Sequence, residues 1–439
     1  MFMNDEHSPK ILAQNRKPTL EDRLSDSPLV HKRIVQIVDL MEKALAEGYT
    51  ADEAEEMAIE QVDGLGNDIL SDWAANQEKS SFEKTKRSHP DAIADSKKNL
   101  HWVTTFGEVS VVERILRLGR RGKRLRPFST EGNVKNRSCS FRLQRVLADF
   151  GSEESFGQVV KRVKEHYRID VTLYAAYSNT LKHAKAMGGI KSGQSPRPAE
   201  DIITEVDGTM VPMTQAGKGV DKRKKKTVSW GEVRLCFARR KGETQSTYGA
   251  IRGSIGSVGI LWEDTVQQSG FDPSTKIHCI SDGAPWIANL FQEIFQDQGD
   301  FLLDFYHVSE YLSDASKAIK PTEATKWRRS QQSKLLTGKS KSVITELARH
   351  KRPNQEEDPV TKGHNYLSRR KDCLHYDKAR AAGLPIGSGE VESGHRHVIQ
   401  KRMKISGAWW KEAHVQPMLN LRTLRANQLW EEYWSQAKN

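Results

Sequence analysis

Cysteine is scarce in this sequence, and no two of its cysteines are close together. Cys139, Cys236, Cys279 and Cys373 form no CxxC pair, which argues against a zinc ribbon and against a disulfide framework. The start, MFMNDEHSPK, lacks the apolar core of a signal peptide, and no run of 18 apolar residues occurs. We therefore expect neither secretion nor a membrane span, and a reducing, cytoplasmic location.

Apolar residues are also few, whereas basic residues are in excess. Apolar side chains make up 36% of 439 residues, and 69 Lys and Arg outnumber 57 Asp and Glu, for a net charge of +12. A chain of this length can bury a core and is expected to hold two to four domains. The positive charge favours a nucleic-acid partner, although a merely basic protein carries the same charge.

Residues 1–98 are predicted to form a helical N-terminal region followed by a linker. Apolar residues recur at spacings of three and four at Ile34, Val38, Met41 and Leu45, which predicts one helix. Gly48 is expected to end it, and Thr50 with Glu53 matches a capping box that opens a second helix. This hairpin is expected to serve packing or dimerisation. The Ser/Lys/Asp-rich stretch 79–98 is expected to be the linker.

Residues 99–190 are predicted to form a small hairpin and a helix-turn-helix-like DNA-binding region. The hairpin, HWVTTFGEVSVVERILRL, leads into a turn with Arg120, Arg121, Lys123 and Arg124. This turn is either a phosphate-contacting arm or a solvated loop. Residues 140–187 look helical, with Thr172 capping a helix that carries Lys182 and Lys185. Two helices with a basic second helix fit DNA recognition, and they fit plain packing equally well.

A Gly/Ser/Pro-rich stretch, 188–200, separates this part from a different pattern. Residues 200–312 alternate strand-like and helix-like segments, which predicts an α/β sheet and the first part of a catalytic domain. Residues 313–383 are helical and basic, and we expect them to be an insertion. Residues 384–439 hold a glycine loop, a helix and a Trp-rich helical tail.

Three acidic residues stand where a phosphodiester-cleaving site would need them. Asp207 and Asp282 each end or interrupt an apolar strand and precede a glycine, and Glu392 follows the GSG loop at the start of a helix. Divalent metal ions that activate phosphodiester chemistry take carboxylate ligands on rigid elements. Each acid has an ordinary alternative, because aspartates occur in turns before glycine and glutamates favour helix N-termini.

The segments SDGAPWI, LLDFYHVSEYL and LPIGSGEVESGHRHVIQKRMK, followed by GAWW, resemble bacterial insertion-sequence transposases of the ISKra type. The similarity covers about residues 201–430. It implies an α/β ribonuclease-H-like catalytic domain of the DDE group, with Asp207, Asp282 and Glu392 as catalytic acids and a helical insertion before the last one. The family pattern GSG-x-VE assigns the third role to Glu392 and leaves Glu390 at a variable place. A bacterial, nucleoid-associated location follows from the same resemblance.

Other residues near these motifs have two interpretations each. Asp304 and His307 either assist the catalytic acids through hydrogen bonds or form a buried hydrogen-bonded pair with each other. His395 and Arg396 share a helix face with Glu392 and either hold DNA or pair with the acid. Lys401, Arg402 and Lys404 are expected to contact DNA phosphates. Trp409 and Trp410 either stack on a base or, as favoured here, pack in the protein.

The sequence therefore predicts a transposase that cleaves DNA at transposon ends and transfers the strand into target DNA. Its expected cofactors are Mg²⁺ or Mn²⁺, as two ions bound by Asp207, Asp282 and Glu392. Its expected partners are the inverted-repeat ends, target DNA and further copies of the chain. The alternatives are a non-catalytic DNA-binding relic of a transposase and a structure-selective nuclease of the same fold.

Overall fold

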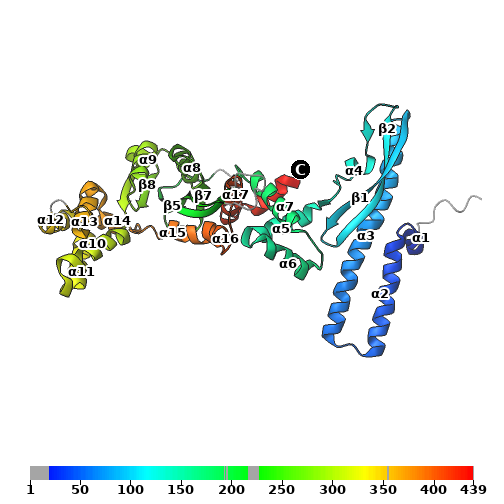
Figure 1. Cartoon of the computed structure of the whole chain (residues 1–439), viewed down its shortest axis with the longest axis horizontal. Helices are drawn as coiled ribbons and strands as arrows, with labels where there is room; N and C mark the ends of the chain where they lie inside the picture. Colours follow the sequence, from blue (N-terminus) through cyan, green and yellow to red (C-terminus); the bar gives the residue numbers. More distant parts are fainter. Residues whose placement is uncertain (1–18, 192, 194–195, 216–226, 353–354, 439) are drawn as a thin grey trace, which may run out of the picture. The chain divides into compact units, whose positions relative to one another are not determined.

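The structure, a computed structural model, describes residues 19–191, 193, 196–215, 227–352 and 355–438. The chain divides into two compact units: Met1–Leu147 with Phe156–Ala176, and Ala148–Ser155 with Tyr177–Asn439. Figure 1 labels many of the helices and strands of both. Within the described ranges, no helix combines the length and the apolar character that crossing a lipid bilayer requires.

The first unit begins with a helical hairpin. Its helices are α1 (Leu20–Ser25), α2 (Pro28–Glu47) and α3 (Ala51–Ser88). Gly48 ends α2 in the left-handed conformation, at φ 68°, and Thr50 and Glu53 form the predicted capping box. Both predictions are confirmed. An ion pair of 2.7 Å between Arg33 and Asp68 joins α2 to α3.

The predicted linker at 79–98 is wrong. Helix α3 continues to Ser88, and strand β1 begins at Ala92. The Phe82 side chain is buried against Ala92 and Leu116. The polar residues that suggested a linker mostly cover the exposed face of a regular helix, so their composition misled the prediction.

A four-stranded sheet packs against α3. It contains β1 (Ala92–Thr104), β2 (Gly107–Leu118), β3 (Arg124–Leu125) and β4 (Ser138–Cys139) in the order β3-β2-β1-β4, with α4 (Pro127–Glu131) beside it. The antiparallel β1–β2 pair confirms the predicted hairpin. The core between sheet and helix holds Ala74, Leu100, Trp102, Val109 and Phe128.

Three helices follow, within the stretch 140–187 that the sequence predicts to be helical. They are α5 (Phe141–Glu153), α6 (Phe156–Tyr167) and α7 (Leu173–Ala186). Thr172 caps α7 as expected, since its Oγ accepts the N–H of Ala175 at 3.0 Å. The division between the two units passes through α5 and α7. The helix-turn-helix interpretation stays a prediction.

The second unit is built on a mixed five-stranded sheet. The strands are β5 (Asp201–Gln215), β6 (Thr227–Arg240), β7 (Ser246–Ile251), β8 (Lys276–Ser281) and β9 (Gly299–Leu303). Their order is β7-β6-β5-β8-β9. Strand β6 runs antiparallel to β5 and β7, whereas β5, β8 and β9 are parallel. The prediction of an α/β sheet is confirmed.

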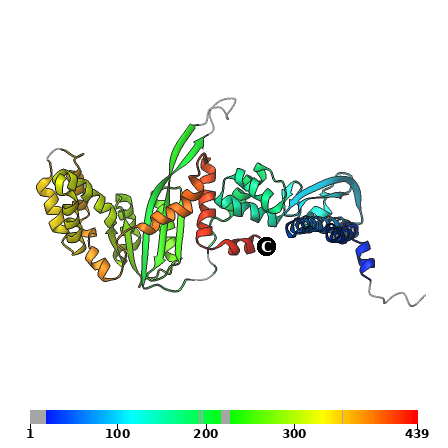
Figure 2. The ribbon, with the colours of Figure 1, turned by 90° about the horizontal axis from the view of Figure 1, so that it is seen from below.

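Helices cover both faces of this sheet. On one face, α8 (Ile255–Gln267) and α9 (Pro285–Phe295) bury a core around Trp262, whose indole N–H donates to Thr204 at 2.7 Å. The other face carries α15 (Gly389–Gly394), a π-helical turn η4 (His395–Gln400) and α16 (Lys401–Met403). Figure 2 shows this segment, in orange, lying across the green strands. Helices α17 (Glu412–Ala426) and α18 (Trp430–Lys438) complete the described part of the unit.

The helical segment predicted for residues 313–383 is present between β9 and α15, and it starts earlier than expected. It contains α10 (Phe305–Ile319), α11 (Ala324–Leu336), α12 (Ser340–His350), α13 (Pro359–Arg369) and α14 (Tyr376–Ala381), with short 3₁₀ turns η2 (Pro321–Glu323) and η3 (Lys371–Cys373). A third 3₁₀ turn, η1 (Gln296–Gln298), precedes β9. The insertion has a core of its own around Leu312, Trp327, Leu335 and Leu367, which explains how so polar a segment stays folded.

Candidate active site

The two predicted aspartates stand level on neighbouring parallel strands. Strands β5 and β8 pair from Asp201↔Lys276 to Glu205↔Ile280 without a shift. Asp207 and Asp282 each come two residues after this last pair, Asp207 within β5 and Asp282 just after the end of β8. Because side chains alternate along a strand, Asp207 belongs to the face that α15 crosses, opposite Thr204 and Trp262.

The register extends to a third acid at the carboxyl end of β9. Strands β8 and β9 pair up to Ser281↔Leu303, so the next level holds Asp282 and Asp304. Asp304 is buried, and its carboxylate caps α10 by accepting the His307 N–H at 2.7 Å. Its other oxygen accepts the N–H and the hydroxyl of Ser388, at 2.5 and 2.6 Å. Asp304 therefore fastens the GSG loop beside the two aspartates.

Asp304 and His307 interact only through the backbone N–H of His307, and their side chains do not pair. The His307 ring lies 3.4 Å from Glu310 and packs edge-on against Tyr311 and Tyr366. The spacing of three residues reflects a helix cap rather than two cooperating side chains.

The glycines after the two aspartates have different local roles. Gly283 has φ 76°, a conformation that favours glycine, and a Cβ there would lie 2.4 Å from Leu303. At Gly208, a Cβ would meet only the flexible end of Glu232. Asp282 is exposed, and its carboxylate accepts the N–H of Ala284 at 2.9 Å, so the turn orients this side chain.

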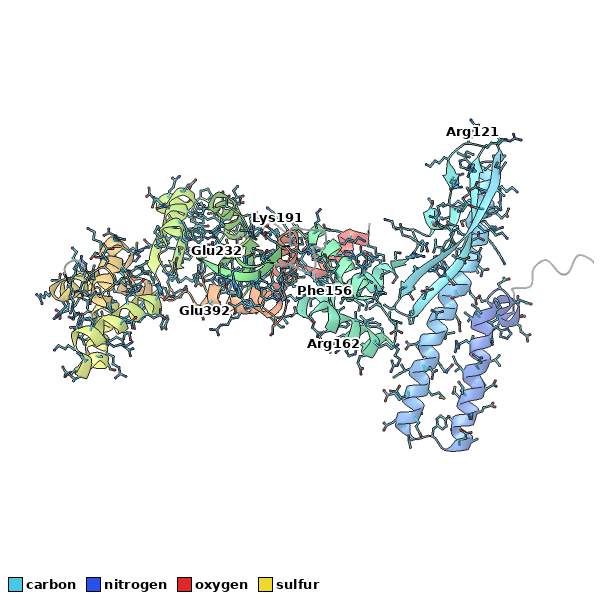
Figure 3. The ribbon with its side chains drawn as sticks, in the orientation of Figure 1. Arg121, Phe156, Arg162, Lys191, Glu232 and Glu392 are labelled. Atoms are coloured by element: carbon cyan, nitrogen blue, oxygen red, sulfur yellow. The ribbon has the colours of Figure 1, made fainter. Side chains whose placement is uncertain are left out.

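The two glutamates of the GSGEVE segment have different surroundings. Glu390 forms an ion pair of 3.0 Å with Arg239. Arg239 pairs with Ile203, four residues before Asp207 on β5, which is about 13 Å along the strand. Glu392 is 67% exposed and pairs at 2.6 Å with the exposed Arg396 one turn later. Figure 3 labels Glu392 on this helix.

His395 lies beside the first predicted acid, Asp207. Its ring is buried, and Nε2 lies 3.3 Å from the Asp207 carboxylate. Neither ring nitrogen has a hydrogen bond among the described residues, because the geometry of this contact is unsuitable for one. A buried imidazole without partners is costly, so this position is suited to a further polar ligand.

Sequence reasoning missed Glu205, which is buried on the same strand face two residues before Asp207. One carboxylate oxygen accepts the N–H of Val391 at 2.7 Å, and the other has no hydrogen-bond partner among the described residues. Burial raises the pKa of Glu205 to about 8. The available signal was an acid inside the apolar run IITEVDG, in phase with Asp207.

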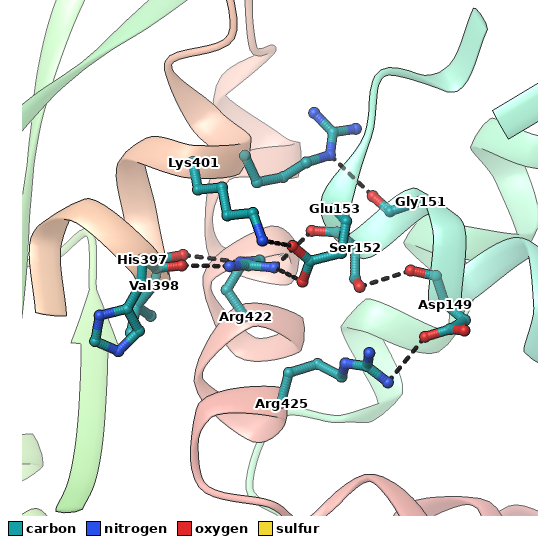
Figure 4. Close-up of polar contacts among 10 residues, drawn as sticks. Asp149, Gly151, Ser152, Glu153, His397, Val398, Lys401, Arg422 and Arg425 are labelled. Atoms are coloured by element: carbon teal, nitrogen blue, oxygen red, sulfur yellow. Dashed lines mark hydrogen bonds and ion pairs between the residues drawn. The ribbon is translucent and has the colours of Figure 1, made fainter. Parts of the chain in front are cut away.

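The π-helical turn is clamped by a buried arginine. Arg422 of α17 donates to the carbonyls of His397 and Val398 in η4, the latter at 2.9 Å, and to Ser152 at 2.9 Å. It also pairs with Glu153. Figure 4 shows this network. π-helical turns often occur at functional sites, and here Arg422 binds carbonyls of that turn.

The basic residues predicted to contact DNA differ in accessibility. Arg402 is buried, donates to the Gly151 carbonyl at 2.9 Å and lies over the Trp410 ring, so its expected phosphate contact is wrong for this conformation. Trp410 is also buried, as favoured, whereas Trp409 is half-exposed. Lys404 is partly buried and donates to Thr209 at 2.8 Å, beside Asp207 on the same strand face.

The remaining predicted contacts are exposed. Lys401 and Arg396 form ion pairs with Glu153 and Glu392, at 2.8 and 2.6 Å. On the β2–β3 turn, Arg124 pairs with Asp95 at 2.8 Å. The other exposed cations are Arg120, Arg121, Lys123, Lys182 and Lys185.

No three side chains of the His, Cys, Asp and Glu type converge closely enough to hold a metal ion within the described part of the chain. The structure thus brings Asp207 and Asp282 to one level and α15 onto the same face. It does not assemble their three carboxylates into a closed ligand set.

Comparison with known proteins yields matches among solved structures. No protein-family model matches the sequence, and no curated protein does. Among solved structures, the Drosophila P element transposase strand transfer complex is similar over 70% of this chain and 82% of that chain, with a TM-score of 0.28 and 7% sequence identity.

Proposed function

We propose that the chain is a DNA transposase of the DDE group that cleaves transposon ends and joins them to target DNA. The observation that carries this proposal is the shared level of Asp207 and Asp282 on adjacent parallel strands, with the Glu392 helix crossing the same face. The resemblance to ISKra-type transposases in the segments around these residues supports it.

The sheet supports a ribonuclease-H-like catalytic domain. Three antiparallel strands are followed by two parallel ones, and the first strand is central in the order β7-β6-β5-β8-β9. Asp207 lies within the first strand, and Asp282 directly follows the last residue of the fourth strand. The insertion separates the fifth strand from the acidic helix, as the resemblance implies.

The contacts of α15 favour Glu392 over Glu390 as the third acid. The segment begins where Ser388 meets Asp304 after β9, passes Glu205 of β5 at Val391 and reaches Asp207 at His395. Glu392 lies one turn before His395, between these contacts. Glu390 is directed toward Arg239 and away from the strand ends.

The donor types suit a hard divalent cation. Mg²⁺ commonly binds one or two protein carboxylates and completes its shell with phosphate oxygens and water. Asp207 and Asp282 would hold it, with Glu392 as the third ligand, and the bound ions would neutralise the scissile phosphate and activate water. The buried His395 lies beside the Asp207 carboxylate, and the charge of Lys404, which donates to Thr209 on the same strand face, would attract DNA phosphate.

The proposal is tested on a DNA fragment that carries the gene's own two flanks. The protein is incubated with this fragment and Mg²⁺, and cuts are mapped on a denaturing gel. Asp282→Asn keeps the oxygen that accepts the Ala284 N–H, so it is expected to fold and to lose cleavage. Asp297→Asn, an exposed aspartate of the same unit, is the matched control and is expected to cut normally.

Cuts at defined terminal positions that disappear in Asp282→Asn would establish the reaction. Cuts at branched DNA regardless of its flanks would instead indicate a structure-selective nuclease. Binding of the flanks without any cut, equal in all three proteins, would overturn the catalytic proposal.

A further inference from the structure

Helix α2 carries two apolar stripes, and only one of them faces α3. The contact line between the helices is marked by Arg33 of α2, which bonds to Gln61 and Asp68 of α3 at 3.4 and 2.7 Å. Ile37 and Leu40 are half-buried along this line. The second stripe is the set named from the sequence, and it is exposed: Ile34 by 38%, Val38 by 49%, Met41 by 54% and Leu45 by 84%.

Helix α3 adds to the same exposed surface. Each residue of an α-helix is rotated about 100° from the one before it. Arg33 of α2 points across the helix–helix contact, and so do Gln61 and Asp68 of α3. The next residue after each of them, Ile34, Val62 and Ile69, is rotated by about 100° away from that contact. Because the two helices are antiparallel, these rotations place all three residues on the same broad face of the hairpin. Val62 and Ile69 are 60% and 49% exposed. We call the six residues Ile34, Val38, Met41, Leu45, Val62 and Ile69 the hairpin face.

We propose that the hairpin face binds the same face of a second copy of this chain, forming a four-helix dimer interface. The alternating spacing of four, three and four along α2 is that of a helix packed against another helix. Scattered exposed apolar residues need no explanation, but six on one face of two adjacent helices mark an interaction surface.

The size of the face fits a dimer. Twenty residues of α2 span about 30 Å, and two helices side by side are about 20 Å wide. The hairpin therefore offers on the order of 600 Å² per copy, close to the roughly 800 Å² per partner of a standard protein interface.

The charge distribution favours an antiparallel pair of hairpins. The turn end carries the exposed acids Glu47, Asp52, Glu53, Glu55 and Glu56. A parallel pair would set five acids against five acids. An antiparallel two-fold arrangement keeps the two acidic turn ends at opposite ends of the interface, which avoids this repulsion.

The test measures the mass of the full chain in solution. Sedimentation equilibrium is run on the wild type, on Val38→Lys and on Val112→Lys, without DNA. Val112, on β2, is 51% exposed and is the matched control outside the hairpin face. The wild type and Val112→Lys are expected to be dimers with the same dissociation constant. Val38→Lys is expected to raise that constant at least about tenfold.

Circular dichroism melting of Val38→Lys is expected to match the wild type at concentrations where both are monomeric, since the side chain is exposed in the single chain. If the wild type stays monomeric up to about 100 μM, the proposal is wrong. This outcome is expected if another part of the same chain covers the hairpin face. Equal weakening by Val38→Lys and Val112→Lys would also overturn the proposal. Neither result depends on cleavage activity, so this experiment tests the dimer independently of the proposed reaction.

Discussion

A carboxyl oxygen of Glu205 accepts the backbone N–H of Val391 at 2.7 Å, and this bond joins the central strand to the helix that carries Glu392. Glu205→Ala would leave that N–H buried without a partner, at a cost of about 1–3 kcal/mol. Glu205→Gln keeps an acceptor oxygen. We expect the alanine variant to melt several degrees lower and to cleave DNA poorly, and the glutamine variant to keep most of both properties. Equal losses in both variants would refute a positioning role for this bond.

The two glutamates of the GSGEVE segment can be separated by activity. Glu392→Gln removes a proposed metal ligand and is expected to lower the cleavage rate at least about a hundredfold. Glu390→Gln removes only an ion pair with Arg239, which is partly exposed, so little change in rate is expected. Single-turnover cleavage at saturating Mg²⁺ provides the measurement. The reverse pattern would move the third acid to Glu390.

His183 makes the second unit sensitive to acid. It is buried against Trp434 and hydrogen-bonded to the Tyr433 hydroxyl at 2.7 Å, and burial lowers its pKa from 6.5 to about 4. The unfolded chain therefore takes up a proton at a higher pH than the folded one. The contribution of neutral His183 to the free energy of unfolding is therefore fully present above pH 6.5. As the pH falls toward 4, the free energy of unfolding decreases by on the order of 3 kcal/mol.

Urea unfolding followed at several pH values between 7 and 4 checks this dependence. In His183→Gln, the free energy of unfolding is expected to decrease less between pH 7 and pH 4 than in the wild type. His350→Gln, an exposed histidine of the same unit, serves as control and is expected to leave the fall unchanged. An identical slope in His183→Gln and the wild type would assign the acid sensitivity to other groups.

Arg422 is expected to be a main polar support of the acidic helix. Arg422→Ala would leave the carbonyls of His397, Val398 and Ser152 without their donor and Glu153 without one of its two basic partners. Loss of such a buried network costs about 3 kcal/mol or more, which corresponds to a melting temperature lower by roughly 6–12 °C. Calorimetry compares it with Arg425→Ala, which loses an ion pair to Asp149 and a cation–π contact with Trp430 and is expected to melt less than about 3 °C lower.

The turn between β2 and β3 is expected to contribute to DNA affinity through charge alone. Arg120, Arg121 and Lys123 are exposed there, and Figure 3 labels Arg121 at this end of the sheet. Replacing all three by alanine is expected to reduce the slope of log affinity against log salt by about 2–3, since each phosphate contact contributes about 0.9. Fluorescence anisotropy with a labelled duplex measures it. Arg124→Ala is the single-site comparison, because Asp95 already partly neutralises that charge.

The sequence by itself determined the local elements and where the acids fall on them. Capping at Thr50, helix termination at Gly48, the β1–β2 hairpin and the alternating α/β pattern depend on neighbouring residues, so short-range physics made them visible. Composition failed at 79–98, because polar residues occupy the exposed side of a helix as readily as a linker.

Only the tertiary structure decided which side chains meet. Strand register, a non-local property, set Asp207, Asp282 and Asp304 on one level and revealed Glu205 beneath the acidic helix. Burial removed Arg402 from the DNA-contacting set and directed Glu390 to Arg239. Such outcomes depend on residues that are far apart in the sequence, whose proximity no periodicity or spacing along the chain records.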